Sequence, residues 1–532
     1  MKKFNKKKVI IISLISIILL GTGSYIYYDS IPKEEPLIGA YIDGTYSETL
    51  PSKRTGYKVD KIVCDNNKNA SWDYDKWGIK LSNWGTRSRC NIYFKSLESF
   101  TIANKTFYLD EMQRCPSMNS DGTVTVTGAE DTYGYLCKAK DAYGSSYYYR
   151  GNVTNNYVLF AGKYWRIIRY NGDGTVRVIY DGTSAHQNSD SSADRQIGTS
   201  AFNEYWKKNN ISESTSSYVY YDNASVGYMY GNRDGIVEQS TEFRTTIYNS
   251  SFFSKYYIAK EYEYDVSTDR FTLKNATSVF GSTMKDDYVG YYTFNKKSSS
   301  TSDQYIYKIT RVTTASSGKT VGYSYVTYGT TSKEKAQTNI NNSAVKSYID
   351  TWYENNIKGT TDEKYIVDNI FCNDRSISSD NLSGSYSNLG YGAEKTIYRW
   401  YHFADSSSNN KMMLICPQQN DAFTVSDKSK GNGALTYGVG LITTDEVVLG
   451  GGWSSNNSNY YLYTGQNYWT SSPFNYSGSM SSERFINSRG SVYDMISSDV
   501  YINNEYGVRP VLNLSSEVLR NGDGTASNPF HP

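Results

Sequence analysis

The sequence predicts an α+β fold that is rich in β-strands, and three observations lead to this prediction. Tyrosine is abundant and proline is rare, with 54 and 9 residues, and tyrosine and threonine favour strands. Short segments of alternating apolar and polar residues recur between clusters of Gly, Asn and Asp, which is the pattern of strands and turns. Helical periodicity is clear in residues 342–357. A chain of 532 residues is also long enough for two or more domains.

The N-terminus predicts a membrane anchor. Residues 1–8 contain five lysines, and residues 9–28 are uncharged and mostly apolar, which is the length of a helix that spans a bilayer. Because lysines stay on the cytoplasmic side, we expect a cytoplasmic tail at 1–8, a transmembrane helix at 9–28 and a linker at 29–38. A cleaved signal peptide is the alternative, although no A-x-A-like site follows. The expected localisation is the cell membrane, single-pass, with the C-terminal bulk extracellular.

Residues 39–97 are expected to form a small β-sandwich module. Their apolar positions alternate in two facing sets, as in a pair of packed sheets. The sets are Tyr57, Val59, Ile62 and Val63, and Trp77, Ile79, Leu81, Ile92 and Phe94. Asp65, Asn67 and Asn69 are spaced like the start of a calcium loop, but Lys76 stands where that loop needs a bidentate glutamate. We therefore interpret this segment as a solvated hairpin.

After a junction at 98–154, residues 155–521 are expected to form a second domain, followed by a tail at 522–532. This domain opens with two strands around an Asp-Gly turn in the segment KYWRIIRYNGDGTVRVIYDG. A long insertion, at about 183–339, is rich in Ser, Thr, Asn and Tyr. Three short Val-Gly-Tyr echoes within it indicate repeated strands.

The segment EYGVRPVLNL, from Glu505 to Leu514, is expected to be the closing strand of the second domain. One face of an extended chain would carry Val508, Pro510, Leu512 and Leu514, and the other Arg509, Val511 and Asn513. This period of two predicts a half-buried strand. Because Pro510 has no N–H to donate, we expect the strand at an edge or paired on one side only. Its expected partners are KYWRII and RVIYDG.

Two helices are predicted in the second domain. Residues 342–357 begin with a capping residue, Ser343, and have apolar residues at helical spacing, so that one face is core. These apolar residues are Val345, Tyr348, Ile349 and Trp352. A second, short helix is indicated by Thr443 and Glu446, which have the spacing of a capping box, and by the glycines from Gly450 that end it.

Six cysteines follow the expected anchor, and an oxidising exterior favours disulfides over free thiols. Fifteen pairings of six cysteines exist in principle. Proximity within the expected structural units favours three of the possible pairs. These are Cys64 with Cys90, Cys115 with Cys137, and Cys372 with Cys416.

The order of these parts resembles a family of bacterial surface proteins, found in gut Firmicutes, that carry a C-type-lectin-like domain. The resemblance rests on AGKYWRIIRYNGDGTVRVIYDG, the helix of Trp352, IFCNDRSIS, GLITTDEV, YWTSSP and GVRPVLNL, and it covers residues 155–521 apart from the insertion. The module at 39–97 is similar to one that often precedes such domains. The group is related in fold to the formylglycine-generating-enzyme family. The resemblance implies that the first and last strands pair and project an irregular loop region, and structural roles are expected for Trp165, Trp352, Trp469 and Arg509.

The resemblance does not extend to known chemistry. The enzymatic relatives use cysteines in the terminal region, whereas no cysteine follows Cys416. The Glu-Pro-Asn, Gln-Pro-Asp and Trp-Asn-Asp triplets of calcium-dependent sugar-binding lectins are also absent. Ser471 and Ser472 lack the G-x-S-x-G context of a nucleophile. No catalytic residue is therefore predicted.

The remaining composition argues against metals, cofactors and nucleic acid. His186, His402 and His531 lack the spacing of metal ligands, and we expect no metal and no cofactor. The formal net charge is +2, and the strongly basic run is the one beside the expected anchor, so nucleic acid is not an expected partner. Arg509 could bind an anion, but pairing with a carboxylate or with backbone carbonyls is the favoured interpretation.

The loops from Trp453 to Glu505 are the candidate binding surface, because Tyr, Ser, Asn and Gly suit adaptable recognition. The candidate residues are Trp453, Tyr460, Tyr461, Tyr476, Asn487 and Tyr493. The sequence thus predicts a membrane-anchored extracellular surface protein, not an enzyme, with a lectin-like ligand-binding or adhesion role toward a glycan or a protein. A variable receptor of the kind encoded with diversity-generating reverse transcriptases, or an enzyme of the formylglycine-generating-enzyme-like fold, is the alternative.

Overall fold

The computed structural model forms two compact units. The first ends at Leu97 and the second begins at Glu98, and each is described by itself. The residues that the structure describes are 38–52, 56–65, 70–74, 76–81, 89–109, 115–204, 206–207, 219–220, 222–233, 243–248, 254–259, 261–265, 270–274, 277–278, 293–294, 308–314, 320–325, 330, 332–378, 390–391, 395–402, 410–477, 481–492 and 501–532.

The first unit is a sheet of four strands with a separate hairpin. The sheet has the order β2-β1-β6-β3, and the hairpin is β4-β5. Their bounds are β1 Ile38–Ile42, β2 Thr45–Ser47, β3 Tyr57–Cys64, β4 Ala70–Asp73, β5 Gly78–Leu81 and β6 Cys90–Ser96. Ile92 and Phe94 are buried on β6, and Trp72 and Trp77 of the hairpin region pack against them. The pairing of β3 with β6 has a register shift between Val59 and Lys61. Beyond this shift Val63 is 49% exposed, so the prediction that Val63 belongs to the core was wrong.

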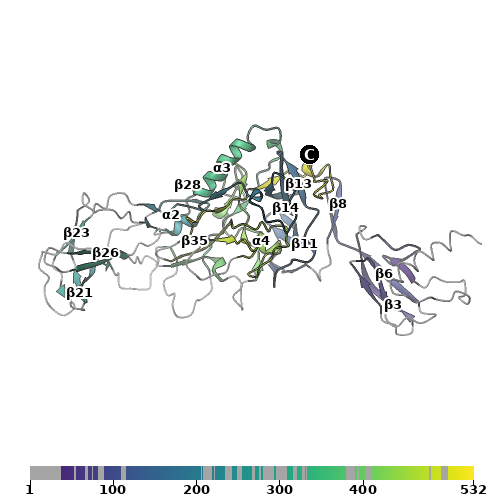
Figure 1. Cartoon of the computed structure of the whole chain (residues 1–532), viewed down its shortest axis with the longest axis horizontal. Helices are drawn as coiled ribbons and strands as arrows, with labels where there is room; N and C mark the ends of the chain where they lie inside the picture. The colour runs from purple at the N-terminus through teal and green to yellow at the C-terminus, as the bar shows by residue number, and fades with distance from the viewer. Residues whose placement is uncertain are drawn as a thin grey trace, which may run out of the picture. The chain divides into compact units, whose positions relative to one another are not determined.

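The second unit is built on a seven-stranded sheet with the order β11-β12-β14-β15-β37-β33, to which β13 adds by pairing with β14. Figure 1 shows β11, β13 and β14 in this body. The bounds are β11 Gly134–Asp141, β12 Gly144–Gly151, β13 Tyr157–Phe160, β14 Lys163–Tyr170, β15 Val176–Gly182, β33 Val439–Gly440 and β37 Val511–Leu514. Because β11 and β12 belong to this sheet, the unit begins before the expected residue 155. The expected tail also joins it, through a bridge from Phe530 to Val158.

The closing strand β37 pairs with RVIYDG on β15, as predicted, but not with KYWRII, which lies on β14 and pairs with β15 instead. Leu512 lies opposite Val178 on β15 and opposite Val439 on β33. The expectation of an edge strand was wrong, because β37 pairs with β15 on one side and with β33 on the other. Pro510 precedes β37, so its missing N–H costs this strand no hydrogen bond to either neighbour. The expectation of a half-buried strand was also wrong. Both faces are buried, since Arg509, Val511 and Asn513 are as inaccessible as Leu512 and Leu514.

A second sheet lies in the same unit, with the order β16-β36-β34-β30 and with β35 paired to β34. The bounds are β16 Thr199–Ser200, β30 Lys395–Ile397, β34 Tyr468–Ser477, β35 Ser481–Ile486 and β36 Tyr506–Gly507. Trp469 is buried on β34 and packs edge-on against Phe202. One apolar core joins residues of the two sheets.

The two predicted helices are present as α3 (Ala344–Asn356) and α4 (Thr444–Leu449). The Ser343 side chain accepts a hydrogen bond from the N–H of Lys346 and so caps α3. The buried face of α3 includes Val345 and Ile349, but Tyr348 is 37% exposed, and Tyr353 is buried in its place. The predicted burial of Tyr348 was wrong, because the buried face of α3 includes Tyr353 instead.

Shorter elements complete the second unit. Before and within the insertion they are β7 Ser99–Ile102, β8 Lys105–Tyr108, β9 Ser117–Met118, β10 Val124–Thr125, η2 Ala193–Arg195, β17 Trp206–Lys207, β18 Val219–Tyr220, η3 Asn223–Val226, β19 Met229–Tyr230, β20 Phe243–Tyr248, β21 Ser254–Ala259, β22 Glu261–Asp265, β23 Arg270–Lys274, β24 Thr277–Ser278, β25 Thr293–Phe294, β26 Lys308–Thr314, β27 Thr320–Tyr325 and α2 Lys333–Ala336. After it come β28 Asn341–Asn342, η4 Glu363–Tyr365, β29 Phe371–Cys372, η5 Arg399–His402, β31 Lys411–Met412, η6 Gln419–Asp421, β32 Ala422–Phe423 and η7 Ser516–Leu519.

The predicted fold class needs one correction. The β-rich architecture is confirmed, but no helix in the described part of the chain is long and apolar enough to cross a membrane. The helix α3 has 13 residues and exposes a polar face, and α4 has 6, whereas a membrane span needs about 20 apolar residues. The predicted span at 9–28 lies outside the described residues.

Candidate ligand-binding pocket

A small polar pocket opens in the second unit beside the disulfide of Cys372 and Cys416. Its cavity volume is about 20 Å³, which is room for about one water molecule. A ligand can therefore insert only an end group. The charged lining residues are Arg169, Arg177, Arg399, Asp374, Asp445 and Glu446, and residues 413–417 form one wall.

Two arginines in the floor of the pocket come from neighbouring strands. Arg169 of β14 and Arg177 of β15 lie directly opposite each other, a placement that is destabilising for like charges. The Glu446 carboxylate compensates for it, because Oε1 lies 2.5 Å from the Nε of Arg177 and 3.2 Å from the Nε of Arg169. Asp141 adds a second anion, with Oδ2 2.8 Å from the Nη1 of Arg169.

The sequence around α4 fixes the position of Glu446. Thr443 is the N-cap, and its hydroxyl accepts a hydrogen bond from the N–H of Glu446 at 3.1 Å. In return, the Glu446 carboxylate accepts one from the N–H of Thr443 at 3.0 Å. The predicted capping box is therefore confirmed, and it aims the carboxylate at the arginines. Burial opposes the charged form, but Arg177 and Arg169 outweigh it and hold the pKa of Glu446 below its usual range.

A third arginine that lines the pocket, Arg399, joins two carboxylates. Its Nε lies 2.6 Å from Asp374 Oδ2, and its Nη2 lies 2.5 Å from Asp445 Oδ2. Burial opposes the charge on Arg399, but Asp445 and Asp374 raise its pKa well above the usual value. The indole N–H of Trp400 also donates to Asp445, at 3.1 Å. Arg399 therefore stays charged and fixes both carboxylates.

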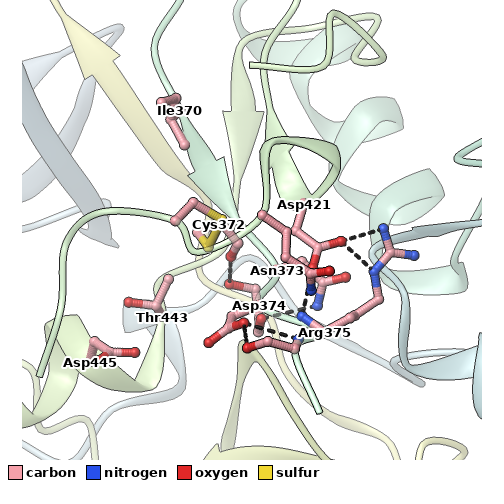
Figure 2. Close-up of a disulfide and its surroundings, with 12 residues drawn as sticks. Ile370, Cys372, Asn373, Asp374, Arg375, Asp421, Thr443 and Asp445 are labelled. Carbon is pink, nitrogen blue, oxygen red and sulfur yellow. Dashed lines mark hydrogen bonds and ion pairs between the residues drawn. A yellow bond between two sulfur atoms is a disulfide. The ribbon is translucent and has the colours of Figure 1, made fainter. Parts of the chain in front are cut away.

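Two contacts join the wall at 413–417 to other residues that line the pocket. The N–H of Met413 donates to Asp445 Oδ1 at 2.8 Å, and Cys416 is bonded to Cys372 at the end of β29. Figure 2 shows this disulfide, with Thr443 and Asp445 on one side of Cys372 and with Arg375 and Asp421 on the other. Within this wall, Ile415 is 39% exposed. The pocket thus combines a polar floor with an apolar rim.

The charges that line the pocket balance and already pair with one another. Three guanidinium groups and three carboxylates line it, and every one of them takes part in an ion pair. A strongly charged ligand would have to compete with these pairs. A neutral ligand with hydroxyl groups can donate to the carboxylates and accept from the arginines without breaking them.

Three of the candidate binding residues lie in the core rather than on the surface. Tyr460, Tyr461 and Tyr476 are each 0% exposed, and Tyr476 lies on β34 opposite Thr396 of β30. Their predicted exposure was wrong, because this part of the chain is packed against the sheets. A buried side chain cannot contact a ligand in this structure.

The other candidates have different surroundings. Trp453 is half-buried and packs against the main core. Asn487 is half-buried, and its side-chain oxygen accepts hydrogen bonds from the N–H groups of Arg489 and Ser491 at 2.9 and 3.0 Å, so it shapes a turn. Tyr493 lies outside the described residues. Neither Trp453 nor Asn487 lines the pocket.

The residues expected to be structural have structural contacts. Trp165 is buried and donates from its indole to the carbonyl of Phe160 at 3.0 Å, and its ring lies 6.1 Å from that of Trp352. Trp469 donates to the carbonyl of Ser200 at 2.8 Å. These contacts join distant parts of the second unit.

Three further residues that the sequence analysis discussed have polar contacts. His186 Nε2 lies 3.0 Å from Asp194 Oδ2. Ser471 donates to the carbonyl of Cys372 at 2.8 Å, and Ser472 accepts from the N–H of Thr444 at 2.9 Å. Ser472 also lines the pocket. The side chain of His402 lies outside the described residues.

Sequence reasoning missed the pocket, although two quoted segments supply part of it. IFCNDRSIS contains Cys372 and Asp374, and GLITTDEV contains Thr443, Asp445 and Glu446. The available signals were Asp374 close to a disulfide cysteine and, in a separate segment, Asp445 and Glu446 close to a capping threonine. Nothing in these segments indicates Arg169 and Arg177, which come from strands far away in the sequence, or Arg399 of η5.

All three expected disulfides are confirmed. Bonds join Cys64 to Cys90, Cys115 to Cys137 and Cys372 to Cys416. Comparisons with protein-family models, with curated proteins and with solved structures gave no match to this chain.

Proposed function

We propose that this chain is an exported surface protein with a lectin-like binding role, and that its pocket binds a neutral polar end group of an extracellular glycan. The observation that carries the proposal is the balance of charge in the pocket. Glu446 pairs with both Arg169 and Arg177, Asp141 also pairs with Arg169, and Asp374 and Asp445 pair with Arg399. Sugar hydroxyl groups match such a mixture of donors and acceptors, because each hydroxyl can both donate and accept.

The size and rim of the pocket support recognition of an end group. A cavity of about 20 Å³ admits no whole sugar ring, so a hydroxyl or a similar small group would enter while the ring stays outside. Ile415 and Pro417 line the pocket and are exposed, so they offer an apolar surface for the less polar face of a ring. This arrangement gives a modest contact area, and we expect weak binding that several copies on a surface would strengthen.

The disulfides support export. Three bonds involve all six cysteines of the chain, and such bonds persist in oxidising surroundings and are rare in the cytosol. An extracellular location is also where a glycan ligand would be met.

A glycan array probed with the full-length protein tests the proposal. We expect binding to a subset of glycans that share one terminal group. Ile415→Asp puts a charge at the rim and should weaken binding to those glycans by about tenfold or more. The matched control is Ile340→Asp, because Ile340 is 65% exposed and does not line the pocket. Equal binding by both variants, or binding of the parent to no glycan on the array, would contradict the proposal.

A further inference from the structure

Glu483 on β35 carries a buried carboxyl group for which the fold provides no partner. The residue is 0% exposed, and neither of its carboxyl oxygens has a hydrogen-bond partner among the described residues. Arg375 acts on it electrostatically, but Arg375 is engaged by Asp421, whose Oδ1 lies 2.8 Å from Nε and 2.7 Å from Nη2. Burying an unpaired carboxylate costs several kcal/mol, so this group needs a physical explanation.

The alternation of β35 shows which way Glu483 points. The Ser481 hydroxyl donates to the carbonyl oxygen of Asp222 at 2.7 Å. Successive side chains of a strand point to opposite faces, so Glu483 lies on the same face as Ser481. Asp222 is the N-cap of η3. The Glu483 carboxyl therefore faces η3.

Strand β30, which pairs with β34 as β35 does, and the residue after it have contacts that agree with this placement. Thr396 accepts a hydrogen bond from the side-chain amide of Asn223 at 3.4 Å, and the Tyr398 hydroxyl donates to the carbonyl of Asn223 at 3.0 Å. Glu483 acts electrostatically on Tyr398. Asn223 thus sits over the part of the sheet that carries Glu483.

The residues of η3 present two more unpartnered oxygens. Asn223 Oδ1 and Ser225 Oγ are buried, and neither has a hydrogen-bond partner among the described residues. With the two carboxyl oxygens of Glu483, they make four buried oxygens on facing elements. The hydroxyl of Ser225 can supply one proton, which leaves acceptors in excess. Hard cations are held by such sets of oxygen ligands.

We propose that η3 and β35 enclose a binding site for a hard metal cation, with Glu483 as the charged ligand and with Asn223 and Ser225 as neutral oxygen ligands. In the described residues, no group of three or more His, Cys, Asp or Glu side chains is arranged to hold a metal. This site differs from such clusters in having a single carboxylate. A low ligand charge implies weak binding, in the range of about 10⁻⁴ to 10⁻³ M that extracellular calcium modules show.

Calcium is the probe for this site, and thermal melting of the full-length protein is the first measurement. At 10 mM CaCl₂, against NaCl of equal ionic strength, we expect the Tm of the parent to rise by about 2 to 3 °C. Glu483→Gln keeps the shape of the side chain but removes its charge, and should abolish the rise. The control is Glu334→Gln, because Glu334 is exposed and its variant should respond as the parent does.

Equilibrium dialysis with radioactive calcium is the second measurement, and it does not depend on the melting of a variant. Relative to the parent, we expect the number of calcium ions bound per protein molecule to fall by one in Glu483→Gln and in Ser225→Ala. In Glu334→Gln this number should be unchanged. A parent that binds no calcium would overturn the proposal and would leave water beside a protonated carboxyl as the occupant. Equal stoichiometry in the parent and in Glu483→Gln would overturn it as well. Neither result bears on the glycan pocket.

Discussion

Arg509 and Asp181 form a fully buried ion pair, with Nη2 of the arginine 3.0 Å from Oδ1 of the aspartate. The other donors of Arg509 bind backbone carbonyls, with Nε 3.1 Å from the oxygen of Tyr180 and Nη1 2.8 Å from that of Leu462. Asp181 also binds Arg195, at 2.8 Å. The arginine beside the closing strand is thereby fixed to the end of β15, and its contacts are those of a scaffold.

Replacing Asp181 by Asn should therefore unfold the second unit at lower denaturant concentration. The change leaves Arg509 and Arg195 buried without their anion, and breaking a buried pair costs about 3 to 5 kcal/mol. Urea titration followed by tryptophan fluorescence measures the loss. Asp60→Asn is the control, since Asp60 is exposed in the first unit and its variant should match the parent. A stable Asp181→Asn protein would show that the pair is dispensable.

Replacing Leu512 by Asp tests the closing strand. Leu512 is 0% exposed between Val178 and Val439, so an aspartate there would bury an unpaired charge and cost several kcal/mol. We expect loss of the cooperative thermal transition of the second unit. Val63→Asp introduces the same side chain at a position that is 49% exposed and should change little. An unchanged transition in Leu512→Asp would refute the burial of this strand.

Glu446→Gln should destabilise the protein in a pH-dependent way. The pKa of Glu446 is lowered in the folded state from a usual value of 4.5, so its stabilisation is complete above about pH 4.5 and is lost as the pH falls through the folded pKa. Near neutral pH, we expect a loss of about 3 to 5 kcal/mol, because the charge of two buried arginines is no longer balanced. Urea titrations should show that the difference in free energy of unfolding between parent and variant becomes smaller below about pH 4.5. A difference that stays constant down to pH 2.5 would contradict this. Glu48→Gln, at an exposed position, is the control.

The disulfide beside the pocket should stabilise the second unit alone. Replacing both Cys372 and Cys416 by Ala should cost about 2 to 4 kcal/mol and should loosen the pocket wall. Peptide mapping without reduction first establishes the pairing in the parent. Scanning calorimetry then compares this variant with one that lacks Cys64 and Cys90, which belong to the first unit. A loss confined to the transition of the first unit in both variants would contradict the assignment.

Local patterns predicted the features that depend on neighbouring residues. The caps at Ser343 and Thr443 follow from spacing within one turn of chain, and the paired cysteines are 22 to 44 residues apart. The period of the last segment also identified β37. Burial on both faces could not be predicted from that period, because Arg509 is made compatible with the core by Asp181, which is 328 residues away.

The pocket could not be predicted for a similar reason. Arg169 and Glu446 are 277 residues apart, and no sequence pattern links a strand arginine to the first turn of a distant helix. The opposite error affected Tyr460, Tyr461 and Tyr476. Tyrosine suits both exposed binding loops and strand-rich cores, so composition alone does not distinguish the two, and packing against the sheets buries all three.

In the proposed function the ligand binds at the pocket rather than on the loops after Trp453, and hydroxyl-radical footprinting tests this placement most directly. Met413 lies in the pocket wall and is half-buried, and Met118 is 43% exposed away from the pocket lining. With the glycan found on the array, we expect the oxidation of Met413 to fall at least about twofold, because more than half of the pockets would be occupied. The oxidation of Met118 and of Trp453 should stay unchanged. Protection of Trp453 with no change at Met413 would contradict the account.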